Sequence, residues 1–159
     1  MLIFYEWSFM SCLKSLPGLV VSLSLLVFAH AAQAKDMVSV DKPEVNMRAG
    51  AGSKHSVLWA LSKGYPLEVT SRKGNWLKVR DFENDTGWVY RPSVAKKPHV
   101  IVKAGIVNVR SAPSTSSRIL GKAEYGEVLR TVEHRSNWVR VQRENGVKGW
   151  VSRGLVWGW

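Results

Sequence analysis

Val45-Asn46-Met47-Arg48 opens a pattern that continues with Gly64, Asn75-Trp76, Val79 and Gly87-Trp88-Val89. The pattern returns as Val107-Asn108-Val109-Arg110, Gly126, Asn137-Trp138, Val141 and Gly149-Trp150-Val151. Each element of the second copy lies 62 residues after its counterpart (46 to 108, 76 to 138, 88 to 150), and no gap is needed. A spacing kept across a whole unit indicates a duplicated structural module. Paired small modules favour a binding function over catalysis.

Short stretches within each copy alternate between apolar and polar residues. Leu67 and Val69 alternate with Glu68 and Thr70, and the sequences Trp76-Leu77-Lys78-Val79 and Trp138-Val139-Arg140-Val141 alternate in the same way. This period of two is typical of half-buried strands. Turn-forming residues separate the stretches, for example Lys73-Gly74-Asn75 and Glu144-Asn145-Gly146. No window shows a sustained helical stripe, so the sequence predicts an all-β fold of two small, partly open barrels.

The first 34 residues have the features of a secretory signal peptide. Leu16 to Ala29 is an apolar run, and Ala32-Gln33-Ala34 is a small-x-small cleavage site. A membrane-spanning helix needs about 20 apolar residues, which is more than this run offers. Residues 1 to 9 are unusual for an export signal because Glu6 is acidic and no basic residue precedes Lys14, which favours Met10 as an alternative start. We expect a periplasmic or secreted protein with no transmembrane span after cleavage; an uncleaved N-terminal anchor is the alternative.

Cysteine content and charge restrict the chemistry further. The single cysteine, Cys12, precedes the apolar run, so a chain cleaved after Ala34 has no thiol for a disulfide or a zinc site. The chain has 23 Lys and Arg against 12 Asp and Glu, a formal net charge of +11, and cleavage removes one residue of each sign. Such an excess attracts polyanions. The basic residues are scattered, however, so a solvated surface and a surface for anionic envelope polymers remain alternatives, and nucleic acid is not an expected partner.

Two interruptions define the expected boundaries. The strand pattern breaks around Arg91 to Pro98, where two prolines predict a short, semi-rigid linker. We therefore expect a signal peptide at 1–34, a first domain at 38–95 and a second at 99–159. The last six residues, 154–159, are unusually apolar for a free terminus. We expect them to fold back on the second barrel or the linker, with an exposed aromatic tail as the alternative.

These residues resemble the bacterial SH3-like domain, whose pattern begins V-N-[VL]-R-[SA]-G-P-[GS]. Residues 45–52 and 107–114 match it, the W-x-[KR]-V strand is matched at 76–79 and 138–141, and the closing G-W-V occurs twice. The resemblance covers about 45 residues of each copy. It implies a five-stranded, partly open barrel found in exported proteins, often attached to cell-wall hydrolases, that binds peptidoglycan or acts as an adaptor. The chain departs from the pattern at Ala51 and Ala112, and Trp59 stands where the second copy has Gly121.

An asparagine and an arginine precede a long loop in each copy: Asn46 with Arg48, and Asn108 with Arg110. In a structural interpretation, the Asn caps a turn and the Arg ties the loop to backbone carbonyls. In a functional interpretation, the Arg is a clamp with bidentate geometry for a carboxylate. The sequence leaves both open.

Aromatic side chains are the main candidates for ligand binding. Alternation places Trp76, Trp88 and Tyr90 on the outer face beside Lys78, with Trp138, Trp150 and Arg140 at the corresponding places in the second copy. A flat ring beside a cation suits a sugar or peptide platform, but it equally suits a ring shielded by a neighbouring loop. The second copy has Gly121 and Ser152 where the first has Trp59 and Tyr90. We therefore predict the groove on the first copy, with Trp59, Trp76, Trp88 and Tyr90 on one surface.

Catalytic patterns are absent from the sequence. The four histidines lie in unrelated contexts, no serine lies in a nucleophile elbow, and metal-ligand spacing is lacking. Asp81, Glu83 and Asp85 lack the glycine and glutamate of a calcium loop and predict a hairpin turn. We expect a non-catalytic module without metal or cofactor and without an attached catalytic domain, which recognises peptidoglycan peptide or glycan through an aromatic and basic groove. The alternative is a periplasmic adaptor that binds an extended segment of a partner protein.

Overall fold

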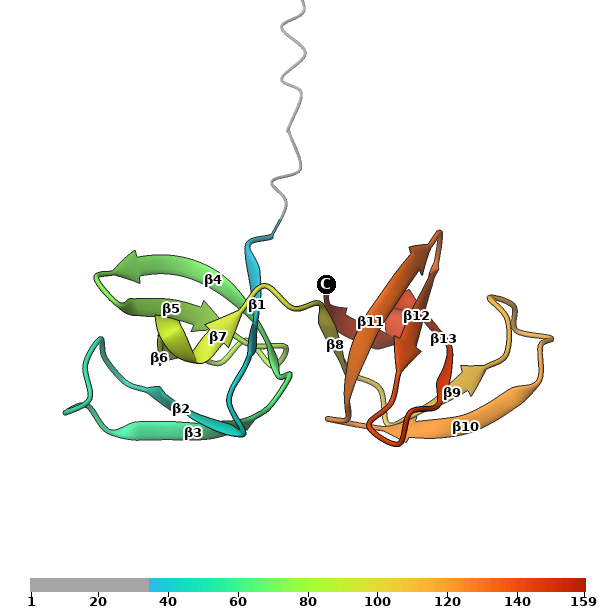
Figure 1. Ribbon diagram of the computed structural model, residues 1–159, viewed down its shortest axis with the longest axis horizontal. Coiled ribbons are helices and arrows are strands. Elements are labelled where there is room, and N and C mark those ends of the chain that lie inside the picture. The colour runs from blue at the N-terminus through green and yellow to red at the C-terminus, as the bar shows by residue number, and fades with distance from the viewer. Residues whose placement is uncertain (1–34) are drawn as a thin grey trace, which may run out of the picture. The chain divides into compact units, whose positions relative to one another are not determined.

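The computed structural model describes residues 35 to 159 (Figure 1), which belong to one compact unit. The predicted signal peptide, residues 1–34, lies outside the described residues. Strands and two short 3-10 helices make up the regular structure from 35 to 159, and this part of the chain has no helix that could cross a membrane. The all-β prediction is therefore confirmed.

Two antiparallel sheets of seven strands each follow one another along the chain. The first contains β1 (Met37–Val40), β2 (Glu44–Arg48), β3 (Val57–Ser62), β4 (Pro66–Lys73), β5 (Trp76–Arg80), β6 (Thr86–Tyr90) and β7 (Val94–Ala95). The second contains β8 (His99–Val102), β9 (Ile106–Arg110), β10 (Ile119–Glu124), β11 (Val128–Arg135), β12 (Trp138–Gln142), β13 (Lys148–Ser152) and β14 (Val156–Gly158). The 3-10 helices η1 (Arg91–Ser93) and η2 (Arg153–Leu155) connect the last two strands of each copy in chain order. The strand orders are β3-β2-β6-β5-β4-β1-β7 and β10-β9-β13-β12-β11-β8-β14, which are identical apart from the shift of seven. The sequence repeat is thus a structural repeat.

Each sheet has more strands than the five that the resemblance implies. The additional pairing in the first sheet comes from β1 and β7, where Ser39 pairs with Ala95 and Val40 with Val94. Because η1 and β7 continue the first sheet to Ala95, only residues 96–98 separate the two barrels. The linker predicted around Arg91 to Pro98 therefore begins later than expected, after Ala95.

The C-terminal segment is the counterpart of β7. Val156 and Gly158 of β14 pair with Val102 and Val100 of β8, and the Trp159 amide donates to the His99 carbonyl at 3.2 Å. The predicted fold-back on the second barrel is confirmed. The apolar composition of the tail follows from its position as a strand that completes the second sheet, with Val156 in the core.

The cores consist of the inward-facing residues of the alternating stretches. Met47, Leu67, Val79 and Val89 are fully buried in the first barrel. Val109, Leu129, Val139 and Val141 are fully buried in the second. Since each barrel is small, its core is small as well. The residues between these inward positions face outward and form the surface on which a ligand could bind.

Candidate ligand groove on the first barrel

A groove forms where β2 and β6 diverge. The two strands are paired at a single position, Arg48 opposite Trp88, whereas β5 and β6 are paired along their whole length. Beyond Arg48, the first half of β2 and the end of β6 leave a groove of about 620 Å³ between them. Its lining residues are Glu44, Val45, Asn46, Arg48, Gly52, Ser53, Trp76, Tyr90 and Ser93.

One wall of the groove is an aromatic pair. Trp76 opens β5 and lies directly opposite Tyr90 on β6, so both side chains project from the same face of the sheet. Their ring centroids lie 5.6 Å apart with planes tilted by 56°. The Tyr90 side chain is 42% exposed and Trp76 is half-buried, so both rings offer part of their surface to solvent. A ligand could stack on this surface without displacing the core.

Arg48 holds the loop that forms the opposite rim. Its Nη1 donates to the His55 carbonyl oxygen at 2.8 Å, and the Ala49 amide donates to the Ser56 carbonyl. A β carbon at Gly50 would lie 2.6 Å from the exposed His55 ring, so a larger residue there would have to shift that ring. The second barrel repeats the contact, because Arg110 Nη1 donates to the Ser117 carbonyl at 2.8 Å. This geometry ties each loop to its strand and positions Gly52 and Ser53 at the groove.

The asparagines that accompany these arginines do not cap turns. Asn46 and Asn108 lie within strands, opposite Ala60 and Lys122. Among residues 35–159, no hydrogen bond involves either side chain. The turn-capping interpretation was therefore wrong for both, because neither side chain bonds to the backbone of the loop. The Asn46 amide is exposed and lines the groove.

Trp59 is not part of this surface. It lies opposite Met47, whose side chain is fully buried, so the ring is on the face of the β2–β3 pair that carries Met47 and not on the face of Asn46 and Arg48. Trp59 remains 53% exposed. The prediction that Trp59, Trp76, Trp88 and Tyr90 share one surface was wrong for Trp59, because the register of β3 could not be read from the sequence.

Trp88 and Lys78 lie on the outer face as predicted, in the row next to the aromatic pair. Trp88 is opposite both Lys78 and Arg48, and it is half-buried between them. Neither Trp88 nor Lys78 lines the groove. Of the two, only Trp88 is a cross-strand neighbour of Arg48.

The second barrel differs at the corresponding positions. Trp138 is half-buried opposite Ser152, and Trp150 lies between Arg140 and Arg110. Trp150 is only 7% exposed, so the expectation that its ring is available at the barrel edge was wrong. Where the first groove has Glu44, Tyr90 and Ser93, the second barrel has Ile106, Ser152 and Leu155.

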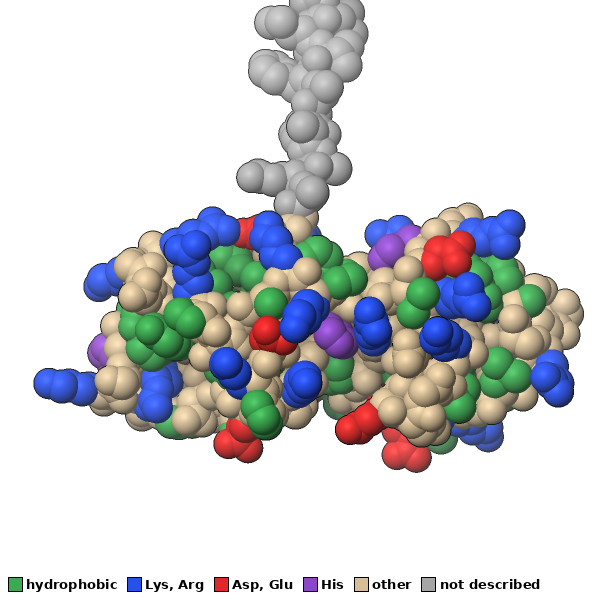
Figure 2. Space-filling view, viewed as in Figure 1, with side chains coloured by type: hydrophobic (Ala, Val, Ile, Leu, Met, Phe, Trp, Pro, Cys, Tyr) green, Lys and Arg blue, Asp and Glu red, His purple; other side chains and the backbone are tan. Residues whose placement is uncertain are grey.

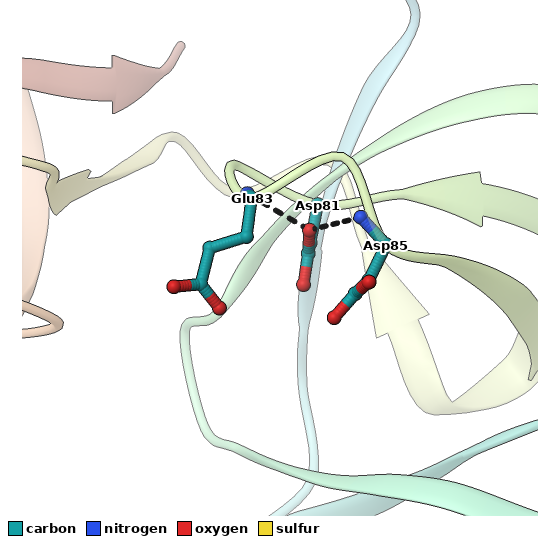
Figure 3. Close-up of side chains that lie close together, drawn as sticks. All are labelled: Asp81, Glu83 and Asp85. Carbon is teal, nitrogen blue, oxygen red and sulfur yellow. Dashed lines mark hydrogen bonds between the residues drawn. The ribbon is translucent and has the colours of Figure 1, made fainter.

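The acidic segment between β5 and β6 forms a tight turn (Figure 3). Asp81 is buried, and its Oδ1 accepts hydrogen bonds from the Glu83 and Asp85 amides, each at 2.9 Å. Burial raises the pKa of the Asp81 carboxyl above its usual value. Carboxylate oxygens of Asp81, Glu83 and Asp85 lie within 4.8 Å of one another, but Asp81 is committed to the backbone of the turn. The predicted hairpin turn is what the structure contains.

A second cavity, of about 990 Å³, was not anticipated from the sequence. It is lined by residues of both barrels, including Lys63, His99, Glu127, Arg130 and Arg143. Arg143 and Glu127 neutralise each other through two hydrogen bonds at 2.8 and 3.2 Å. Burial lowers the pKa of His99.

Lys and Arg side chains are spread over the visible face of the molecule and do not form one basic stripe (Figure 2).

Comparison with known proteins identifies the modules. Residues 41–96 match one family model described as the bacterial SH3 domain, and residues 105–156 match a second with the same description. The chain therefore belongs to the bacterial SH3 domain proteins and carries two such domains in tandem.

The relatives of the chain are longer proteins. It is 23% identical over 137 residues to YrvJ of Bacillus subtilis (strain 168), which is named as a proposed N-acetylmuramoyl-L-alanine amidase. The match covers 79% of this chain and 26% of YrvJ, so the chain spans about a quarter of that protein. Among solved structures, NlpC2 from Trichomonas vaginalis is 12% identical with a TM-score of 0.37, and covers 79% of this chain and 48% of its own. An NlpC/P60 family protein from Bacillus cereus ATCC 10987 is 16% identical with a TM-score of 0.36, over 76% of this chain and 55% of its own.

Proposed function

We propose that this chain is an exported, non-catalytic module that binds peptidoglycan through the groove on its first barrel. The observation that carries the proposal is the partly exposed Trp76–Tyr90 pair beside a groove lined by Asn46 and Arg48. The rings offer a flat surface for a sugar ring or a peptide plane. The amide and the guanidinium offer hydrogen-bond donors to acetamido, hydroxyl or carbonyl oxygens.

The family and one relative support a cell-wall ligand. Two bacterial SH3 domains make up most of the described chain, and YrvJ carries the name of an amidase that acts at N-acetylmuramoyl-L-alanine. The groove lies on the surface of a sheet and not in an enclosed cavity, so a long polymer can pass across it. These features are consistent with attachment to a wall polymer outside the cytoplasm.

The groove lining lacks the usual partners of a nucleophilic serine. Its two serines, Ser53 and Ser93, have no histidine or cysteine beside them in the lining. A hydroxyl needs an adjacent base before it can attack an acyl carbon. This lining supports the proposal that the groove recognises its ligand without cleaving it.

Sedimentation with purified peptidoglycan sacculi tests this proposal. We expect residues 35–159 to sediment saturably, and Trp76→Ala to weaken binding by about tenfold or more, as truncation of a central aromatic contact does. Tyr90→Ser, which introduces the residue of the second barrel, should weaken binding in the same direction. Trp59→Ala is the matched control, because it removes an exposed indole from the same barrel outside the groove.

Two results would refute the proposal. One is equal binding by wild type and Trp76→Ala when circular dichroism shows that both are folded. The other is an equal loss of binding in Trp59→Ala. If the wild-type protein does not sediment at any salt concentration, the wall ligand is excluded. A partner protein with an extended segment then becomes the ligand to seek.

A further inference from the structure

The groove carries opposite charges at its two ends. Glu44, Asn46 and Arg48 alternate along β2 and so project from the same outer face. Glu44 is the one acidic residue among the groove-lining residues, and Arg48 is the one basic residue. They are four positions apart along the strand, so their Cα atoms are spaced by about 13 Å at a rise of 3.3 Å per residue. The site is therefore dipolar along the strand direction.

Both charged groups are available to a ligand. Glu44 is exposed and forms no ion pair with any residue from 35 to 159. Arg48 uses Nη1 for the His55 carbonyl. A guanidinium has five N–H donors, so four remain for a carboxylate at the groove.

The fold does not require an acid at this place. The second barrel has the same strand order and the same arginine contact, yet Ile106 occupies the position of Glu44 and is 65% exposed. Ser152 and Leu155 likewise replace Tyr90 and Ser93. Since an exposed isoleucine is tolerated there, the fold leaves Glu44 available to a ligand of the first groove.

We propose that the first groove binds an extended peptide whose ammonium group pairs with Glu44 and whose carboxylate pairs with Arg48, about four residues away along the peptide. An extended peptide spans about 3.3 to 3.6 Å per residue, so four residues match the spacing of the Glu44 and Arg48 Cα positions along β2. The Asn46 amide would bond to the peptide backbone between them, and the Trp76–Tyr90 pair would contact its apolar side chains. The inference rests on the proposed function and names the peptide, not the N-acetylated glycan, as the part of the wall that is recognised. Acetylated sugars carry no ammonium group for Glu44.

A series of blocked peptides tests this inference. Tetra-alanine, its N-acetylated form and its C-terminal amide are titrated into isotopically labelled residues 35–159 and followed by NMR. We expect blocking of either terminus to weaken binding about two- to fivefold, the range of one exposed ion pair. Glu44→Gln should remove the preference for the free ammonium but keep the preference for the free carboxylate. Glu124→Gln, the same change at an exposed site outside the groove, should behave as wild type.

Three outcomes would overturn the inference: equal affinity of wild type for free and acetylated peptide, an unchanged preference in Glu44→Gln, or no binding of tetra-alanine at all. If sacculi still sediment in a Trp76-dependent manner in any of these cases, the proposed function stands and the pairing of Glu44 with a peptide ammonium group fails. If sacculi fail to sediment while the peptide binds with the expected preferences, the peptide chemistry stands and the wall is not its source.

Discussion

The glycine of each Gly-Trp-Val motif lies where two strands cross at close range. A β carbon on Gly149 would lie 2.5 Å from Val109 Cγ1 and 2.9 Å from the Arg110 carbonyl oxygen. A β carbon on Gly87 would lie 2.5 Å from Met47 Cγ and 3.1 Å from the Arg48 carbonyl oxygen. Alanine at either position therefore has to displace a core side chain and the backbone of the facing strand.

The two substitutions should differ in cost because the displaced side chains differ in stiffness. Overpacking a core costs about 1 to 3 kcal/mol. Val109 is branched at its β carbon and has few rotamers, and it is fully buried. Met47 is unbranched and adapts to irregular space. We expect Gly149→Ala to lower the free energy of unfolding by about 3 kcal/mol and Gly87→Ala by about 1 kcal/mol.

Urea unfolding of residues 35–159, followed by circular dichroism, measures both values. Gly154→Ala is the control, because no atom lies within 4 Å of a β carbon there, and it should change the free energy of unfolding by less than about 1 kcal/mol. The reasoning is refuted if Gly149→Ala is as stable as the control, or if Gly87→Ala is the more destabilised of the pair.

Three further predictions concern the turn, the tail and pH. Asp81→Ala should cost about 1 to 3 kcal/mol of stability because two amides of the turn lose their acceptor, and Asp81→Asn should cost less because one oxygen remains; equal losses in urea unfolding would contradict this. Gly158→Ala should detach β14, because this glycine has a φ of +132° and a β carbon would lie 2.5 Å from the His99 carbonyl oxygen; unchanged tryptophan fluorescence and proteolysis of the tail would count against it. The pKa of His99 is lowered by burial, so below about pH 6.5 the unfolded chain binds more protons at this residue and stability falls as pH falls. His99→Gln should reduce the stability difference between about pH 7.5 and about pH 5, and an unchanged difference would show that His99 does not contribute.

The sequence contained enough information for the fold because the relevant signals are local and occur twice. The alternation of Leu77 and Val79 with Trp76 and Lys78 reports which residues face inward, and the structure buries the first two. Repetition at a fixed spacing strengthened each assignment. The short pairing of β1 with β7 was missed, because two-residue strands such as Val94–Ala95 have no periodicity to detect.

The site was only partly accessible from the sequence. Trp76, Tyr90, Asn46 and Arg48 were identified and lie together at the groove. The burial of Trp150 and the placement of Trp59 depend on packing and on strand register, which alternation alone does not specify. Glu44 was overlooked because it precedes the repeated motif by one residue. The sequence nevertheless shows that the equivalent residue of the second copy, 62 positions later, is Ile106 and not an acid.

The most direct test of the account is to map the bound surface at residue resolution. Soluble peptidoglycan fragments are titrated into isotopically labelled residues 35–159, and NMR shift changes are assigned to residues. If the ligand binds in the groove, the largest changes occur at the Trp76 indole, the Asn46 side-chain amide and the Ser53 backbone amide, because these three residues line it. Largest changes at Trp138 and Asn108 of the second barrel, or no changes at all, would contradict the account.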